Sequence, residues 1–513
     1  MVSAPHDRFG VGTTFLLILA AFVGNFLLSW PIVFSFDLWV FKDRSSLLNL
    51  DYLLDKNFKL GVDTTYSYGL LPVLIQHVLF SVFGRGYWPL IGCTIIYLIL
   101  TALFWARLLQ HLPNQKIGLA AVVALSPIII IVNPNFPHCL LILSILFSLL
   151  FVLERRLDIA LACSVVGAVS VPSLPLVMVA LIVFLTVFSW WVGPDRTILN
   201  LAKQLWPGIV TYLVLISFIT GFFGFRSVLA TALPFQGASF YRTMNFGLFS
   251  SFLAPKGVGF RYYLGNPIGW WVASSLILVA LAAIGTWAMV RRRTLDTYSI
   301  FILLCACIHV VLAFFAYGSK PQHVIYDPVL AAGVLVGVLR LPAGSLRKIL
   351  IGVFVWLGVL GYSGQIRWTW TSWQTTKPTW YPPQLYAEPS WAAEWARIVK
   401  LSAEHKLLLL SYGTGARQYF PSVETPDVWF FLIGLLSDAE RLRIISQIQS
   451  AEIVVEDLSG PLEAVYDYPD IQHQFDALCL TESTSHFQIW QRRAADSVRS
   501  DCKTNSLLKA ASD

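Results

Sequence analysis

Charged residues are scarce in this 513-residue chain. They make up 13% of the sequence, while hydrophobic residues make up 56% and the mean hydropathy is +0.67. Because a soluble globular protein carries about 25% charged residues, these values exclude an ordinary soluble enzyme. The apolar residues also fall in blocks of roughly 14–25 with almost no charge, which is typical of a polytopic membrane protein.

Several sequence motifs are also missing. There is no HExxH, no CxxC and no Walker-type glycine loop, so nothing supports a zinc protease or an ATP-driven pump. Of the seven cysteines, five lie in apolar blocks, where cysteine behaves as a small hydrophobic residue. Cys479 and Cys502 lie outside these blocks and could pair if they face an oxidising compartment.

The net charge of +7 is unevenly distributed along the chain. Residues 365–513 carry 18 acidic and 13 basic residues, whereas residues 1–364 carry 23 basic and 11 acidic ones. A basic membrane half is therefore joined to a mildly acidic, more polar half. The overall positive charge does not indicate nucleic-acid binding, because membrane proteins place basic residues in their cytoplasmic loops.

Apolar segments long enough to cross a bilayer begin with residues 11–33. A shorter stretch, 69–83, carries Pro72 and His77 and is predicted to be re-entrant or juxtamembrane. The further candidate spans lie at about 89–110, 117–133, 138–153, 157–170, 172–190, 206–225, 266–290, 297–318, 323–340 and 348–364.

Loop charge predicts the topology. If these helices alternate and 69–83 does not cross, all the basic loops fall on the side of the N-terminus, which is the cytoplasm by the positive-inside rule. We therefore expect about eleven crossings in the cell (inner) membrane, a cytoplasmic N-terminus and an extracytoplasmic C-terminal half. The basic loops are Arg107–Lys116, Arg155-Arg156, Arg196–Lys203, Arg291–Arg293 and Arg340–Lys348.

The first outer loop, residues 34–88, is unusually acidic. It contains five of the eleven carboxylates of the membrane half: Asp37, Asp43, Asp51, Asp55 and Asp63. Residues 46–60 fit an amphipathic surface helix, with Asp51 and Asp55 on its solvated face. Asp37 differs, because it follows the first span inside the aromatic run 36–39. A partly desolvated carboxylate at the membrane surface suits general-base catalysis.

The stretch Gly61–Pro72, with Asp63 and the Tyr66-Ser67-Tyr68-Gly69 run, resembles the GT-C superfamily of integral-membrane glycosyltransferases. The likeness is greatest to bacterial members akin to protein O-mannosyltransferases and the aminoarabinose transferase. It implies a polyprenyl-phosphate-linked sugar donor, an extracytoplasmic acceptor and a catalytic aspartate early in the first outer loop. Asp37 occupies the matching place, with Asp43 as an alternative, and Asp63 or Asp43 would orient the acceptor or a divalent metal.

The sequence departs from the family pattern at two points. It has Leu70-Leu71-Pro72 where the family usually has Pro-Leu directly after the glycine, and it lacks the Asp-Glu pair that many members carry at the catalytic position. Tyr66 and Tyr68 are predicted substrate-binding residues, because they offer rings and hydroxyls at the interface.

A leaving phosphate needs cations at the outer membrane interface. Arg242 and Arg261 stand beside tyrosines and are predicted to bind it, since arginine matches phosphate oxygens bidentately. The alternative is that these arginines contact lipid headgroups. A second group of candidates lies close together at the start of a span: Lys320, His323, Tyr326 and Asp327. For His138, helix capping is preferred over a metal or phosphate contact.

The C-terminal half begins with an aromatic, proline-rich linker at 365–390, which is typical of a membrane interface. Residues 391–498 are predicted to form a small α/β domain, and 499–513 a disordered tail. Its expected helices are 390–404 and 437–449, and its expected strands 406–412, 452–455 and 486–491. The run Gly413-Thr414-Gly415 follows a strand and is interpreted as a turn rather than a nucleotide site.

Taken together, these features predict a membrane glycosyltransferase that moves a sugar from a polyprenyl-phosphate donor to an extracytoplasmic glycan, lipid or protein. The alternative is a transporter or flippase for a lipid-linked or anionic solute. Transporters usually show internal repeats and ionisable residues in their spans, and here only His309 stands out within one. A third interpretation is a scaffold whose C-terminal domain binds partners.

Overall fold

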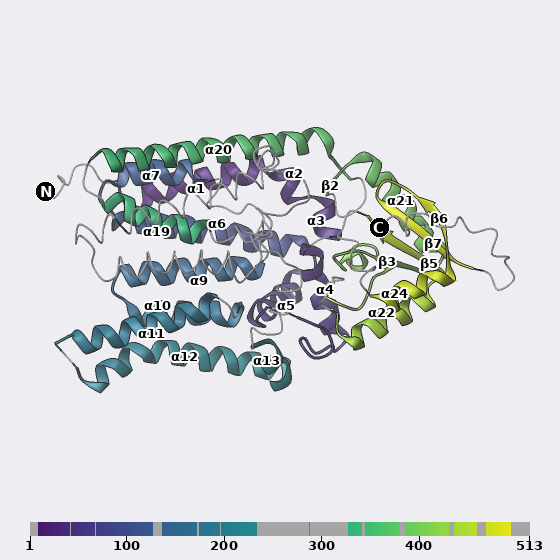
Figure 1. The fold of residues 1–513 in the computed structure, drawn as a ribbon, viewed down its shortest axis with the longest axis horizontal. Helices are drawn as coiled ribbons and strands as arrows, with labels where there is room; N and C mark the ends of the chain where they lie inside the picture. The colour runs from purple at the N-terminus through teal and green to yellow at the C-terminus, as the bar shows by residue number, and fades with distance from the viewer. Residues whose placement is uncertain are drawn as a thin grey trace.

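A bundle of apolar helices is joined at one end to a small domain built on a sheet (Figure 1). This confirms the predicted fold class in outline: a helical membrane bundle with a C-terminal α/β domain. The computed structural model describes residues 9–41, 43–66, 68–126, 136–171, 174–194, 196–232, 287, 327–340, 344–379, 385–429, 436–458 and 468–493.

The helices of the bundle follow the apolar segments of the sequence. In chain order they are α1 (Val11–Leu28), α2 (Trp30–Val33), α3 (Phe36–Val40), α4 (Asp43–Asp55), α5 (Leu71–Phe83), α6 (Tyr87–Gln110), α7 (Gln115–Ala124), α9 (Phe136–Leu153), α10 (Leu157–Ser170), α11 (Leu174–Val192), α12 (Ile198–Phe223), α13 (Phe225–Ala232), α19 (Asp327–Arg340) and α20 (Ser345–Thr375).

Among the described residues, five helices are long and apolar enough to cross a membrane: α1, α6, α9, α11 and α12. Shorter apolar helices accompany them, α5 among these. With 13 residues, α5 is about 20 Å long, less than the ~30 Å hydrocarbon core, which fits the expected re-entrant or juxtamembrane segment. Apart from residue 287, the predicted spans 266–290 and 297–318 lie outside the described residues, so the number of eleven crossings stays a prediction.

Buried polar side chains join the helices inside the bundle. Asn25 of α1 donates to Ser126 Oγ at 2.7 Å, and Gln115 of α7 donates to Thr14 Oγ1 of α1 at 3.0 Å. Polar groups in an apolar bundle bond to one another because lipid offers them no partner. These pairs therefore hold α1 and α7 in register.

The first predicted span, 11–33, is broken into two helices. α1 ends at Leu28, and α2 begins at Trp30 with Pro31 in its first turn, where proline is tolerated because its missing N–H would be unpaired anyway. The short helix α3 and then α4 follow, so the chain changes direction repeatedly at the end of the bundle nearest the C-terminal domain (Figure 1).

Helix α20 connects the bundle to the C-terminal domain. It continues as a helix to Thr375, beyond the expected end of the last span at 364, so the first part of the predicted linker is helical. The short strands β1 (Lys377–Pro378) and β2 (Tyr386–Ala387) pair antiparallel after it. Tyr386 N then donates to Phe34 O at 2.8 Å and ties this connection to the start of the first outer loop.

The C-terminal domain is a five-stranded mixed sheet in the order β4-β3-β5-β7-β6. The strands β3 (Leu407–Leu410), β4 (Val423–Glu424) and β5 (Ile453–Asp457) are parallel, and β6 (Leu478–Ser483) and β7 (Phe487–Arg492) are antiparallel. The predicted helices are confirmed as α21 (Pro389–Glu404) and α22 (Asp438–Ser450), and the three predicted strands as β3, β5 and β7. The prediction missed β4 and β6, while α24 (Pro469–Gln472), η3 (Ala416–Gln418) and η4 (His473–Ala477) complete the domain.

Aromatic side chains pack the two halves together. Phe36 and Phe41, at the two ends of α3, contact Trp391 and Trp395 of α21, with ring centroids 4.8–6.3 Å apart. All four rings are buried. Burying each such ring contributes about 1.5–3 kcal/mol, so the first outer loop and the C-terminal domain form one continuous core.

Candidate active site

Asp37 lies in the first turn of α3, between the two phenylalanines that enter the C-terminal domain. Its side chain is half-buried, and its Oδ1 is buried. Two residues further on, Trp39 is fully buried and donates from Nε1 to Val33 O at 2.8 Å, which fixes α3 against α2. Asp37 therefore stands at the junction of the bundle and the C-terminal domain, in the partly desolvated setting that was predicted.

Arg44 is a residue that the sequence analysis missed. It lies in the first turn of α4, next to α3, and only 2% of it is exposed. Its guanidinium lies 4.7 Å from the centre of the Trp39 ring. A buried guanidinium is costly unless anions surround it. No local sequence signal singled it out, because the same loop also contains Lys42, Lys56, Lys59 and Arg85.

The other predicted carboxylates have different settings. Asp43 is the first residue of α4, and its side chain lies outside the described part of the structure. Asp63 accepts a hydrogen bond from Lys59 N at 2.8 Å and so closes a turn over residues 59–63. Gly61 lies within this turn and has a φ of +77°. The structure thus gives Asp63 a role in shaping the loop, and a Cβ on Gly61 would lie 2.9 Å from Thr231 Cγ2 of α13.

Asp55 is exposed as predicted, but Asp51 does not lie on the solvated face. Asp51 is 3% exposed, and it contacts His77 Nδ1 of α5 at 2.7 Å and Arg85 Nε at 2.6 Å. Arg85 also pairs with the exposed Asp55. The prediction for Asp51 is wrong because its partners come from α5 and the residues after it, which cover that face of α4. These ion pairs hold α4 against α5.

Tyr66 and Tyr68 come together with two further rings, and we call Tyr66, Tyr68, His138 and Trp429 the four-ring cluster. The ring centroids of Tyr66 and Trp429 are 4.8 Å apart, and those of Tyr68 and Trp429 are 5.4 Å apart. Tyr68 Oη lies 3.4 Å from His138 Nε2 in the first turn of α9. His138 thus contacts a predicted substrate-binding tyrosine, while its preferred role as a helix cap stays a prediction.

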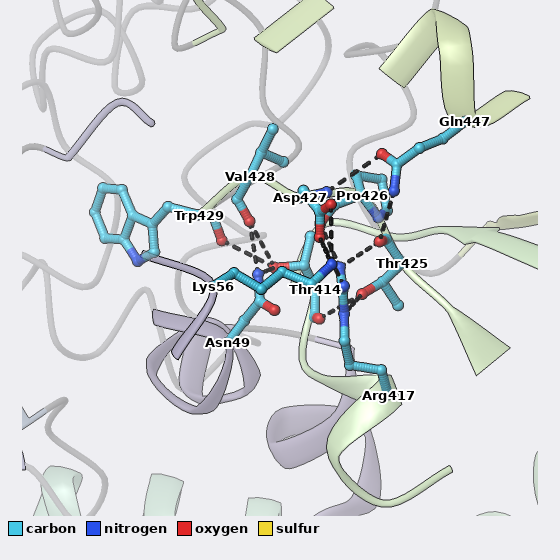
Figure 2. A network of polar contacts seen from close by, with 10 residues as sticks. All are labelled: Asn49, Lys56, Thr414, Arg417, Thr425, Pro426, Asp427, Val428, Trp429 and Gln447. Atoms are coloured by element: carbon cyan, nitrogen blue, oxygen red, sulfur yellow. Dashed lines mark hydrogen bonds and ion pairs between the residues drawn. The ribbon is translucent and has the colours of Figure 1, made fainter. Parts of the chain in front are cut away.

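The C-terminal domain docks on α4 through a polar network (Figure 2). Asn49 Nδ2 donates to Thr414 Oγ1 at 2.6 Å and to Val428 O at 2.7 Å. Arg417 donates to Asp427 Oδ1 at 2.8 Å, and Lys56, directly after α4, pairs with the same carboxylate at 3.3 Å. The segment that carries Trp429 is thereby fixed to the first outer loop.

The glycine-rich run after β3 is part of this contact. Gly413 N donates to Phe41 O at 2.6 Å, and a Cβ on Gly415 would lie 2.3 Å from Ser45 O. The close approach of two backbones explains why glycine is needed there. The interpretation as a turn agrees with this arrangement.

A buried glutamate clamps the same loop from α22. Glu440 is 1% exposed and accepts from Thr64 Oγ1 at 2.7 Å and from Thr65 N and Oγ1, each at 2.8 Å. It also completes the capping box of α22 with Ser437. The two residues before Tyr66 are therefore held by the C-terminal domain.

The cations predicted to bind phosphate cannot be placed against this site. Arg242, Arg261, Lys320, His323 and Tyr326 lie outside the described residues. Within the described part of the chain, no group of three His, Cys, Asp or Glu side chains is arranged to hold a metal ion. The residues that the structure describes therefore assign no metal ligands.

A structural comparison places this architecture among known folds. ArnT from Cupriavidus metallidurans, in a crystal structure bound to undecaprenyl phosphate, superposes with a TM-score of 0.51 at 13% identity, covering 94% of this chain and 98% of that chain. This chain has a GT-C-like fold. Archaeoglobus fulgidus oligosaccharyltransferase, in a complex with Zn and sulfate, gives a TM-score of 0.45 at 10% identity over 92% of this chain and 72% of that one. The AglB oligosaccharyltransferase from the same organism, with an inhibitory peptide and a dolichol-phosphate, gives 0.49 at 9% identity over 97% and 76%.

No protein-family model matches the sequence, and no curated protein matches it significantly. The GT-C-like fold is therefore recognised from its three-dimensional arrangement.

The GT-C-like fold carries an apolar cavity of about 110 Å³ beside the four-ring cluster's loop. Gly69 and Leu70, which follow Tyr68 directly, form one wall, and residues of α10, α11, α12 and α13 form the others. Gly69 N donates to Ser170 O at 2.9 Å, and a Cβ there would lie 2.0 Å from Val169 O. The loop thus approaches α10 closely, and the residues directly after Tyr68 line an apolar space.

Proposed function

We propose that this protein is a membrane glycosyltransferase that transfers a sugar from a polyprenyl-phosphate donor to an acceptor hydroxyl on the extracytoplasmic side. The observation that carries the proposal is the placement of Asp37 and Arg44 on consecutive helices of a GT-C-like fold, at the junction with the C-terminal domain. ArnT, the neighbour with this fold, was crystallised bound to undecaprenyl phosphate, which supports a lipid-linked donor.

Two further observations support the proposed orientation. Arg107 and His111 both contact Glu154, which brings two of the basic loops together at the end of the bundle where α1 begins, opposite the C-terminal domain (Figure 1). Basic loops gather on the cytoplasmic side. Cys479 of β6 is disulfide-bonded, and disulfides persist in oxidising compartments; Cys502 lies outside the described residues. The C-terminal domain would therefore be extracytoplasmic.

In the proposed reaction, Asp37 accepts the proton of the acceptor hydroxyl. The acceptor oxygen forms a bond to the anomeric carbon, and the bond from that carbon to the phosphate oxygen breaks. The polyprenyl phosphate leaves with the electron pair. Arg44 would stabilise its charge, together with Arg242, Arg261, Lys320 and His323. The prenyl chain would lie in the lipid, beside the apolar cavity at Gly69 and Leu70.

The other first-loop acids take supporting roles in this scheme. Asp63 would hold the loop that presents Tyr66 and Tyr68, since its carboxylate closes the Lys59–Asp63 turn. Asp43, directly before Arg44, remains the alternative base or would orient the acceptor. The proposal needs no metal step.

The test uses the full-length protein in nanodiscs with undecaprenyl-phosphate-linked mannose, glucose and aminoarabinose as donors and a membrane extract as acceptor. We expect at least one donor to release undecaprenyl phosphate. Asp37→Asn should lower the rate by at least about 100-fold, because it removes the base, while undecaprenyl phosphate still binds by native mass spectrometry. Asp158→Asn, at an aspartate in the first turn of α10, is the matched control and should keep full activity.

Two outcomes would contradict the proposal. Full activity in Asp37→Asn would remove Asp37 from the mechanism. If the wild-type protein neither releases nor binds undecaprenyl phosphate, the polyprenyl-phosphate donor is wrong.

A further inference from the structure

We infer that the four-ring cluster is a binding site for a sugar ring, in which Tyr68 and His138 contact the ring, Tyr66 donates to one of its hydroxyls and Trp429 positions both tyrosines. This deepens the proposed function and rests on it. The cluster joins three separate parts of the chain: the first outer loop, the head of α9 and the C-terminal domain.

The four rings differ in how deeply they are buried. Tyr66 and Trp429 are buried, at 2% and 3% exposure, whereas Tyr68 and His138 are half-buried. Each pair is arranged edge to face, with interplanar angles of 67–85°. Tyr68 and His138 therefore form the accessible rim, and Tyr66 and Trp429 form its support. Aromatic side chains with a few polar groups among them are typical of small-molecule sites.

The hydroxyl of Tyr66 is the observation that points to a ligand. It is buried and makes no hydrogen bond with any described residue. Burial raises the pKa of Tyr66, so the group stays a neutral donor. A buried hydroxyl without a partner is destabilising, and phenylalanine would fill the same space without that cost. The hydroxyl is therefore explained by a partner that arrives with the substrate.

Sugar rings match this chemistry. A pyranose has an apolar face of C–H groups that packs on aromatic rings, and hydroxyls around its edge that accept from Tyr66 and bond with His138. His138 and Tyr68 already lie within 3.4 Å, so a ring hydroxyl has two polar groups at the rim. The sugar can belong to the donor headgroup or to a glycan acceptor, since the same ring chemistry serves both.

Trp429 acts as a positioning residue because its backbone is fixed on the first outer loop. Thr414 Oγ1 donates to Trp429 O at 3.2 Å and to Val428 O at 3.0 Å, while Asn49 of α4 donates to Val428 O (Figure 2). The C-terminal domain thus completes the sugar site and does more than cover it.

The experiment measures binding of methyl α-D-mannopyranoside and methyl β-D-glucopyranoside to the full-length protein in nanodiscs by saturation-transfer NMR, with sorbitol as an open-chain polyol control. We expect at least one glycoside to bind and sorbitol to give no signal. Tyr66→Phe should weaken glycoside binding about tenfold, because one hydrogen bond is lost. Its melting temperature should stay equal or rise, since the unpartnered hydroxyl is gone.

The matched control is Tyr97→Phe, which removes another buried tyrosine hydroxyl, in α6. It should leave glycoside binding unchanged. Trp429→Leu should weaken binding by a similar factor, whereas Trp429→Phe should restore most of it if the residue acts through ring packing. Equal binding by wild type, Tyr66→Phe and Trp429→Leu, or no glycoside signal above sorbitol, would overturn the inference.

Competition separates the two sources of the sugar. Displacement of the glycoside by an undecaprenyl-phosphate-linked sugar, but not by undecaprenyl phosphate alone, assigns the site to the donor headgroup; no displacement by either assigns it to the acceptor. Failure of the proposed function can be distinguished from failure of the sugar site. If the protein transfers no sugar but binds glycosides through Tyr66, the proposed function is wrong and the sugar site stands. If the protein transfers sugar but glycoside binding is unchanged in Tyr66→Phe, the proposed function stands and only the sugar site is refuted.

Discussion

The clamp made by Glu440 should fail when its carboxylate is replaced by an amide. All its contacts are with donors: Thr64 and Thr65 on one side, Ser437 N and Oγ on the other. In Glu440→Gln, the side-chain NH₂ group faces the Thr65 N–H donor in one amide orientation and the Ser437 N–H donor in the other. Either way a buried backbone donor loses its acceptor. Hydrogen bonds to charged groups contribute about 1.5–3 kcal/mol, so we expect a loss of about 3 kcal/mol.

A change of about 3 kcal/mol corresponds to roughly a 100-fold rise in local opening. Hydrogen-exchange mass spectrometry of the full-length protein should show this rise in peptides covering residues 58–66 and the first turn of α22. Peptides from α6 should be unchanged. Glu404→Gln, at an exposed glutamate in the last turn of α21, is the control and should exchange like the wild type. Equal protection of residues 58–66 in Glu440→Gln and wild type would refute the clamp.

Two further changes test the C-terminal domain and its docking. Burial raises the pKa of Glu456 to about 7 although Trp490 Nε1 donates to it, so the folded domain binds this proton more tightly than the unfolded chain does. Stability from this group is full below about pH 4.5 and is lost as the pH rises to about 7. Glu456→Gln should thus stabilise the domain by about 3 kcal/mol at pH 8 and have little effect at pH 4, as measured by thermal melts; a pH-independent effect would contradict the assignment. Gly415→Ala should destabilise docking by about 1–3 kcal/mol and expose the first outer loop to proteases, because its Cβ meets Ser45 O. Gly352→Ala, in open space on α20, should not, and equal protease sensitivity of the two variants would argue against the close contact.

The first outer loop and the C-terminal domain act as one unit in this protein. The loop supplies Asp37, Arg44 and the two tyrosines, while the domain supplies Glu440, the polar network around Arg417, and Trp429. Because these groups interlock, a change in the domain is expected to alter the geometry of the loop. In the proposed function, this arrangement gives the C-terminal domain a direct influence on substrate binding.

The sequence by itself determined the features that depend on local composition. Long apolar runs predicted the helices of the bundle, because exclusion of charge from lipid is decided residue by residue. The alternation of helix and strand signals located α21, α22, β3, β5 and β7. The aromatic run around Asp37 correctly indicated a partly buried carboxylate at the end of the first span.

Only the tertiary structure decided which distant residues meet. The sequence predicts that Asp51 is solvated, but in the folded protein His77 and Arg85 cover it. Asn49 bonds to Thr414, which is 365 residues away in the sequence. Arg44, Glu440 and Trp429 carry no local pattern that marks them as parts of a site. The physical reason is that hydropathy and periodicity report which face of a segment is apolar, whereas the partner of a buried charge or ring depends on how remote segments pack.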